Sequence, residues 1–252
     1  MLKCLRQIWT LCLISPGFMF KAICGGIVIF CLSNHFLKRP IYQKLYGKPD
    51  NQVLQIADRD SFIEIPNQEI IPIKVNGYDI EVQAIKRFET TTRIVYIDRY
   101  SSLGTWYRSH EGASLYDAIV PQDLSFATGA SGRNSDCFSF DHEYRCLLTD
   151  KSDKKKCPTE VFKNTSTEIS NNHSVAINST VQRGIDILKV GDIAHIEGYL
   201  MYWNGTGKLR YQRFESAITP GQISKELYGG RKSKLCRQLL ITKLTFDGYT
   251  FE

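Results

Sequence analysis

The chain has 252 residues, of which 42% are hydrophobic and 23% charged, and this composition excludes disordered, collagen-like and coiled-coil proteins. The formal net charge of +6 arises at the N-terminus, because residues 1–48 hold seven of the 32 basic residues and no acidic residue. Beyond Lys48, 25 basic residues stand against 26 acidic ones. That part of the chain is not basic, which argues against a nucleic-acid partner, since counterion release from phosphates requires a positive surface.

The first predicted element is an apolar segment from Ile8 to Leu37, in which Lys21 is the one formally charged residue. The segment is long enough to span a membrane, and we expect a helix from about Pro16 or Phe18 to Leu37. A signal peptide is the alternative, including a lipoprotein-type cleavage before Cys24. No Ala-x-Ala cleavage site is present and the apolar run continues past Cys24, so the sequence favours an uncleaved anchor.

These features divide the chain into three parts. Residues 1–39 are predicted to be an N-terminal membrane anchor whose partner is the lipid bilayer, and residues 40–60 a polar tether. Residues 61–252 are predicted to form a strand-rich domain. Basic residues are balanced on the two sides of the anchor and leave the orientation open, but the four domain cysteines permit two disulfides and hence an oxidising compartment.

The first half of the domain shows strand patterns with β-branched residues. The expected strands are Phe62–Ile65, Ile70–Val75, Tyr78–Ile85 and Arg93–Ile97, and Asn76-Gly77 predicts a tight hairpin between the second and third. Small residues dominate from Thr128 to Asn134, which is typical of a surface loop.

The second half combines a helix with long strands. Val181, Ile185 and Leu188 recur at helical spacing, Asn178 or Ser179 can cap the helix, and Gly191 is expected to end it. Long strands follow, Ile193–Trp203, with Gly198 suited to a bend, and Cys236–Phe246. The pattern predicts an α+β domain around a curled antiparallel sheet with one or two helices; an OB-like barrel or another small barrel remain open alternatives.

Four segments in this order resemble a family of uncharacterised bacterial proteins with an N-terminal membrane segment or signal. They are YDAIVPQDLSFATG at Tyr116–Gly129, Asn171-Asn172-His173, the segment from Val190-Gly191-Asp192 to Gly198-Tyr199-Leu200, and KLCRQLLITKL around Cys236. The chain departs from the family pattern where Ala127-Thr128-Gly129 replaces a Trp-Gly stretch and Leu235-Cys236-Arg237 replaces Ala-Cys-Glu. The resemblance implies an extracytoplasmic domain at a bacterial inner membrane, facing the periplasm, and no known activity.

His173 is the strongest candidate for chemistry. It follows Asn171 at the start of a predicted strand, where an imidazole suits a general base or a polar-ligand contact, with Asp123 or Asp192 as the nearby carboxylate. The competing interpretation is a histidine that fixes a loop by hydrogen bonds to the backbone, with Asp123 as a cap and Asp192 as a turn residue. A Cys-His nucleophilic site would require a thiol beside an imidazole, which spacing does not reveal.

The domain cysteines and aromatic residues supply the other candidates. Cys137, His142, Cys146 and Cys157 match no familiar zinc spacing, so we predict a Cys137–Cys146 disulfide, no metal site and no cofactor. Trp106, Tyr199 and Trp203 are predicted to line a ligand-binding face, although most aromatic residues of such a domain are core or cross-strand pairs.

The sequence therefore predicts a single-pass membrane protein of the bacterial envelope, whose extracytoplasmic domain binds or assembles with other envelope proteins without catalysis. The alternative is a membrane-anchored hydrolase that uses His173 with a nearby carboxylate. A flat contact surface would favour the first, and a convergence of His173 with a carboxylate would favour the second.

Overall fold

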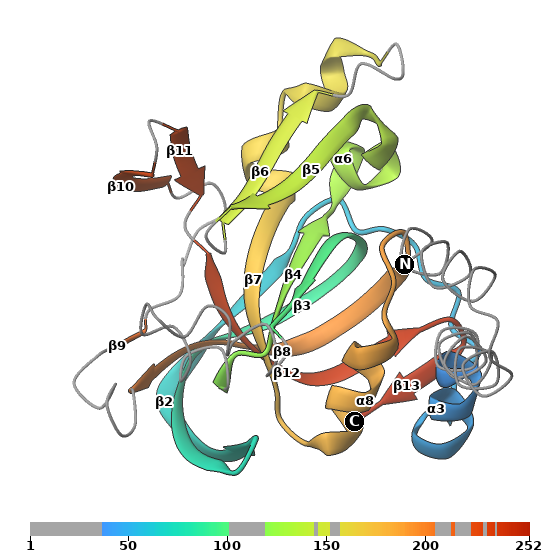
Figure 1. Cartoon of the computed structure of the whole chain (residues 1–252), viewed down its shortest axis with the longest axis vertical. Coiled ribbons are helices and arrows are strands. Elements are labelled where there is room, and N and C mark those ends of the chain that lie inside the picture. The colour runs from blue at the N-terminus through green and yellow to red at the C-terminus, as the bar shows by residue number, and fades with distance from the viewer. Residues whose placement is uncertain are drawn as a thin grey trace, which may run out of the picture. The chain divides into compact units, whose positions relative to one another are not determined.

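The computed structural model describes residues 37–100, 119–143, 146–151, 157–204, 213–214, 223–228, 231–234 and 236–252 (Figure 1). The chain divides into two compact units, Met1–Gly47 and Lys48–Glu252, which are described separately below. The predicted membrane helix and Trp106 lie outside the described residues. Among the helices of those residues, none is long and apolar enough to cross a membrane.

The first unit contains helix α3, Lys38–Tyr46. Pro40 is tolerated because it lies in the first turn, where the backbone N–H groups have no intrahelical acceptor. Leu37, Ile41 and Leu45 follow at intervals of four residues and are exposed, so they form an apolar stripe along one side of the helix. Basic side chains lie on the same helix at Lys38, Arg39 and Lys44.

The second unit begins at Lys48, so it includes residues 48–60 of the predicted tether. Its strand β1, Lys48–Pro49, pairs with β13, Tyr249–Phe251, at the C-terminus. Further along, Ala57 N donates to Thr91 O at 2.8 Å. The carboxylate of Asp60 forms a buried ion pair with Arg237 at 2.5 Å. The segment is therefore attached to the domain at Lys48–Pro49, at Ala57 and at Asp60.

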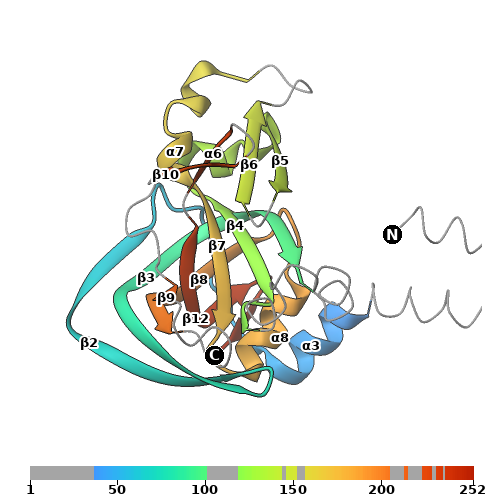
Figure 2. The ribbon, with the colours of Figure 1, turned by 60° about the vertical axis from the view of Figure 1, so that its left-hand side comes forward.

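A long hairpin follows, formed by β2, Ser61–Val75, and β3, Tyr78–Arg99 (Figure 2). Its turn lies at the predicted Asn76-Gly77, where both residues have positive φ, 48° and 87°. β3 also includes the separately predicted strand Arg93–Ile97, so the two strand patterns belong to one continuous, strongly curved strand.

Five strands close into a ring. β3 pairs with β4, Gln122–Ala127, and β4 with β7, Ile169–Ala176. β7 pairs in parallel with β12, Arg237–Phe246, and β12 pairs with β8, Ile193–Asn204, which returns to β3. The predicted curled sheet is thereby confirmed, although it is mixed rather than purely antiparallel.

Helix α8, Ser179–Ile187, connects β7 to β8 as predicted, and the Asn178 side chain caps it by accepting from Val181 N at 2.9 Å. The helix ends before Gly191, which instead adopts a positive φ in the turn that enters β8. Val181 and Ile185 are fully buried, as are the ring residues Phe88 and Phe126, which stack at 6.4 Å. The main core therefore lies inside the ring, with α8 packed on it.

A second apolar layer is built by the chain between β4 and β7. It contains α6 (Gly129–Arg133), η2 (Ser135–Cys137), β5 (Phe138–Glu143), β6 (Cys146–Lys151), η3 (Thr159–Phe162) and α7 (Thr165–Glu168). The expected surface loop at Thr128–Asn134 is wrong, because α6 buries Gly129, Ser131 and Gly132. The small residues permit close packing: a Cβ on Gly132 would collide with the Ala127 carbonyl.

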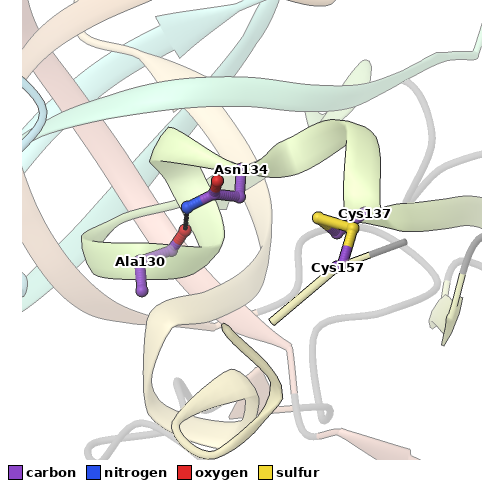
Figure 3. Close-up of a disulfide and its surroundings, with 4 residues drawn as sticks. All are labelled: Ala130, Asn134, Cys137 and Cys157. Carbon is purple, nitrogen blue, oxygen red and sulfur yellow. Dashed lines mark hydrogen bonds between the residues drawn. A yellow bond between two sulfur atoms is a disulfide. The ribbon is translucent and has the colours of Figure 1, made fainter. Parts of the chain in front are cut away.

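The disulfide of this layer joins Cys137 to Cys157, with their Cα atoms 5.9 Å apart (Figure 3). The predicted Cys137–Cys146 pairing is therefore wrong. In the β5–β6 hairpin, Cys146 lies opposite Glu143 at the turn, whereas Cys137 precedes Phe138 at the open end. Six residues of strand place them about 20 Å apart, far beyond disulfide reach.

The remaining described strands are short. β9, Arg213–Phe214, extends the sheet beside β8, and β10, Ile223–Tyr228, pairs with β11, Arg231–Lys234.

The ring closes at Gly198, where β8 lies between β3 and β12 and an added Cβ would collide with the Leu240 carbonyl oxygen. We expect Gly198→Ala to lower the free energy of unfolding by about 3 kcal/mol, because neither backbone can move without breaking ladder hydrogen bonds. Gly77→Ala is the matched control: its Cβ meets nothing within 4 Å, so only the backbone strain of a positive φ, about 1 kcal/mol, is expected. Urea unfolding of the detergent-solubilised chain measures both values, and equal losses would contradict the steric explanation.

Candidate functional site

Polar side chains cross the outer face of the ring over β4, β7 and β12. On each strand they alternate with core residues such as Leu124 and Phe126, so they point away from the interior of the ring. The strand register aligns Asp123 with His173 and His173 with Gln238, and aligns Ser125 with Asn171. We call this set the polar band; its members are Asp123, Ser125, Asn171, His173, Cys236 and Gln238.

The first row of the polar band contains the predicted His173 and Asp123. His173 Nδ1 lies 2.6 Å from Asp123 Oδ1, and the Tyr100 hydroxyl donates to Asp123 Oδ2 at 2.8 Å. Asp123 is 0% exposed and His173 is 8% exposed. When Asp123 is ionised and the ring is neutral, Nδ1 carries the ring proton and donates a hydrogen bond to the carboxylate, so Nε2 is the basic atom. This is the geometry of an oriented general base.

The second row runs parallel to the first and is displaced from it by two residues on each strand. Ser125 Oγ donates to Asn171 Oδ1 at 3.1 Å, and Asn171 Nδ2 donates to Cys236 Sγ at 3.3 Å. Ser125 and Asn171 are buried, whereas Cys236 is partly exposed. Two oriented hydrogen-bonded rows therefore cross the same face, and the second ends on a thiol.

Apolar clusters enclose the polar band on two sides. Next to His173 and Gln238 along their strands, Val175 and Leu240 pack with residues of the curved β2–β3 hairpin, including Ile73. On the other side, Ala127 and Ile169 pack with the disulfide-bearing layer. The polar groups consequently lie in a low-dielectric setting, which strengthens their electrostatic interactions.

β3 extends the first row with Asp98, which is aligned with Asp123. His142 of β5 stacks on Tyr96 at 4.6 Å and places Nδ1 3.6 Å from Asp98 Oδ2. The His142 imidazole, followed by the Tyr100 hydroxyl, holds the pKa of Asp98 below its ordinary value, against partial burial and the charge of Asp123. Burial, followed by the charges of Asp98 and Asp141, raises the pKa of Tyr96.

The structure does not bring Asp192 into this site. Asp192 lies in the turn before β8, where its Oδ2 accepts from Lys189 N at 2.8 Å. Its neighbour Ile193 is aligned with Arg93, which is aligned with Ala127 at the far end of β4. Four residues of strand, about 13 Å, separate that end from Asp123. Asp192 is thus a turn residue and not the partner of His173.

Of the predicted aromatic residues Tyr199 and Trp203, the structure describes the side chain of the first only. Tyr199 is partly buried and packs against the apolar cluster beside the polar band, as a core residue does. The backbone of Trp203 pairs with Val82 and Phe214, while its side chain lies outside the described part of the structure.

Sequence reasoning missed Tyr100 and Asp98, and it weighed His142 only as a possible zinc ligand. Only the curvature of β3 and the docking of β5 bring these residues together. The alternation of Tyr96, Asp98 and Tyr100 at the end of a strand was the available signal. The Cys137–Cys157 bond uses two of the four residues considered for zinc, and the described residues contain no group of three or more side chains placed to hold a metal ion.

The lowered pKa of Asp98 predicts acid sensitivity. Because the pKa is lower in the folded protein than in the unfolded chain, Asp98 contributes stability above pH 3.8, and this contribution is lost as the pH falls through the lowered value. We expect Asp98→Asn and His142→Gln each to flatten the fall in unfolding free energy between about pH 5 and pH 2. Urea unfolding at each pH measures the slope, and a wild-type slope in Asp98→Asn would contradict the assignment.

Comparison with protein-family models, with curated proteins and with solved structures finds no match to this chain. The bacterial family resemblance noted in the sequence therefore stays a prediction.

Proposed function

We propose that the protein is a membrane-anchored, extracytoplasmic module of the bacterial envelope that binds other envelope proteins. The observation that carries this proposal is the order of the five ring strands. Numbered along the chain, β3, β4, β7, β8 and β12 are the first to fifth strands, and around the ring they lie in the order first, second, third, fifth, fourth. The third and fifth strands are parallel, and a helix connects the third strand to the fourth. This order matches the OB-like barrel, a fold that recurs in binding modules. The step from fold to binding is an analogy.

The surface that OB barrels commonly use for ligands is the outer face of the second and third strands. Here those strands are β4 and β7, and their outer face is covered by the two apolar clusters and the enclosed polar band. The non-basic domain and the covered face both disfavour a nucleic-acid partner. A protein partner requires another surface.

Strand β2 offers that surface. Within the described residues it pairs only with β3, and Ile63 and Ile70 are exposed on it, by 52% and 64%. Pro66 and Pro72 interrupt its capacity to pair with a further strand, which is a common protection of sheet edges against aggregation. We therefore expect a partner to contact β2 through the side chains of Ile63 and Ile70 and not by adding a strand to it.

Features of helix α3 favour the proposal of a membrane anchor. It follows directly on the predicted spanning segment, and its exposed Leu37, Ile41 and Leu45 accompany Lys38, Arg39 and Lys44. An apolar stripe with basic flanks is typical of a helix that lies in the lipid headgroup region.

A second candidate function, the hydrolase, is favoured by the 2.6 Å contact between His173 and Asp123. A buried carboxylate that holds one nitrogen of an imidazole is the arrangement that orients a general base in hydrolytic sites. The experiment that closes the next subsection tests this candidate.

The Cys137–Cys157 disulfide predicts the location of the domain. In intact cells, a thiol reagent that does not cross the inner membrane should label Cys157 only after reduction, and should label it without reduction in Cys137→Ser. Peptide mapping by mass spectrometry identifies the labelled residue. Labelling of Cys157 in Cys137→Ser only after permeabilisation would place the domain in the cytoplasm and contradict the proposal.

The β2 surface predicts a position-specific partner contact. A photoreactive amino acid at position 70 should form one cross-linked adduct of defined mass in cells, while the same residue at position 190 should not. Ile70 and Val190 are equally exposed, 64% and 61%, so the two positions differ in place and not in accessibility. Identical adduct patterns, or no adduct at position 70, would argue against binding through β2.

A further inference from the structure

The two rows of the polar band place a thiol diagonally beside an imidazole. Gln238 is aligned with His173 across the parallel β7–β12 pair, and Cys236 precedes Gln238 by two residues on the same face. A strand spacing of about 4.8 Å and two residues of rise put the Cα atoms of Cys236 and His173 about 8 Å apart. Diagonal neighbours at this spacing are within reach when one side chain is long or aromatic.

We propose that Cys236 is a nucleophile for acyl transfer, with His173 as its general base and with Asp123 and Tyr100 as positioning residues. The inference deepens the hydrolase candidate and rests on it. The substrate class is an acyl group carried as an ester, thioester or amide. A thiol, an imidazole and a carboxylate that orients the imidazole form the general arrangement of covalent catalysis by cysteine.

The surroundings of Cys236 suit a reactive thiol better than a structural one. The sulfur accepts a hydrogen bond from Asn171 Nδ2 at 3.3 Å, so the thiol is held on the same face as His173. Ser125 donates to the Asn171 side-chain carbonyl oxygen, so both ends of that amide are engaged in hydrogen bonds. Cys236 is partly exposed, so a substrate or reagent can reach it, whereas Ser125 and Asn171 are buried.

His173 is held in the orientation that the base requires. Asp123 is fixed through both carboxylate oxygens, one at 2.6 Å from His173 Nδ1 and one accepting from Tyr100 at 2.8 Å. This holds the ring in one tautomer, with Nε2 as the atom that takes up a proton. Gln238 adds a side-chain amide on the same face, a group of the kind that stabilises a developing oxyanion.

The reaction balances without an oxidant or reductant. His173 Nε2 takes the thiol proton as Cys236 Sγ attacks the acyl carbon, the bond from that carbon to the leaving oxygen, sulfur or nitrogen breaks, and the proton passes to the leaving group. A thioester remains on Cys236. Water, deprotonated by His173, then attacks the thioester and releases the acid and the thiol.

The test uses the full-length protein in detergent and p-nitrophenyl acetate as the acyl donor. We expect an acetyl adduct on the peptide that contains Cys236, formed about a hundredfold more slowly in His173→Gln. His195→Gln is the matched control: that ring bonds Thr91 at 2.9 Å and lies near Glu197, outside the polar band, and its rate should equal the wild-type rate. An intact Cys137–Cys157 disulfide in peptide maps, with unchanged protease resistance, verifies folding of each variant.

The pH profile of iodoacetamide alkylation at Cys236 separates positioning from structure. Asp123→Asn should move that profile toward higher pH, whereas Asp192→Asn, in the turn before β8 and outside the polar band, should leave it in place. An adduct that forms equally fast in wild type and His173→Gln, or no adduct on Cys236, overturns the inference. Turnover that persists in Cys236→Ser but is abolished in His173→Gln overturns Cys236 as nucleophile and retains the hydrolase. A His173-dependent adduct without turnover supports the nucleophile and rejects hydrolysis.

Discussion

Closure of the ring through β8 is the constraint on which the other features depend. β8 must pair with β3 on one side and β12 on the other, and Gly198 is the position at which no side chain can stand between β8 and the Leu240 carbonyl. Once the ring closes, each strand has an inner and an outer face. The inner face takes the apolar core, and the outer face of β4, β7 and β12 takes the polar band.

The polar band is costly to bury, and the structure offsets that cost by satisfying its groups in rows. Asp123 is fully buried, and both its oxygens are engaged by His173 and Tyr100. A buried carboxylate with fewer partners would destabilise the fold by more than an ordinary hydrogen bond contributes. Such rows serve a purely structural purpose equally well, so the proposed chemistry depends on Cys236, the member that carries a thiol and is partly exposed.

The two proposed functions, binding and catalysis, place different demands on this fold, and the residues proposed for each lie in different places. The exposed Ile63 and Ile70 lie on β2, outside the ring, where a partner can contact them without disturbing the polar band. The disulfide-bearing layer covers one side of the polar band and reaches β3 through the stacking of His142 on Tyr96. The same layer therefore encloses the site and contributes to its electrostatics through Asp98.

Local patterns in the sequence determined the elements that local physics controls. The Asn76-Gly77 turn, the Asn178 cap with its helix and the strand Ile193–Trp203 were predictable, because backbone preference and periodicity specify them within a few residues. His173 and Asp123 were identified as candidates from residue type and position. Tertiary structure alone decided that Asp123, and not Asp192, meets His173, that Cys137 bonds Cys157, and that Cys236 joins the polar band. These contacts join residues 20 or more positions apart, and their distances follow from strand register and ring closure, which no local pattern encodes.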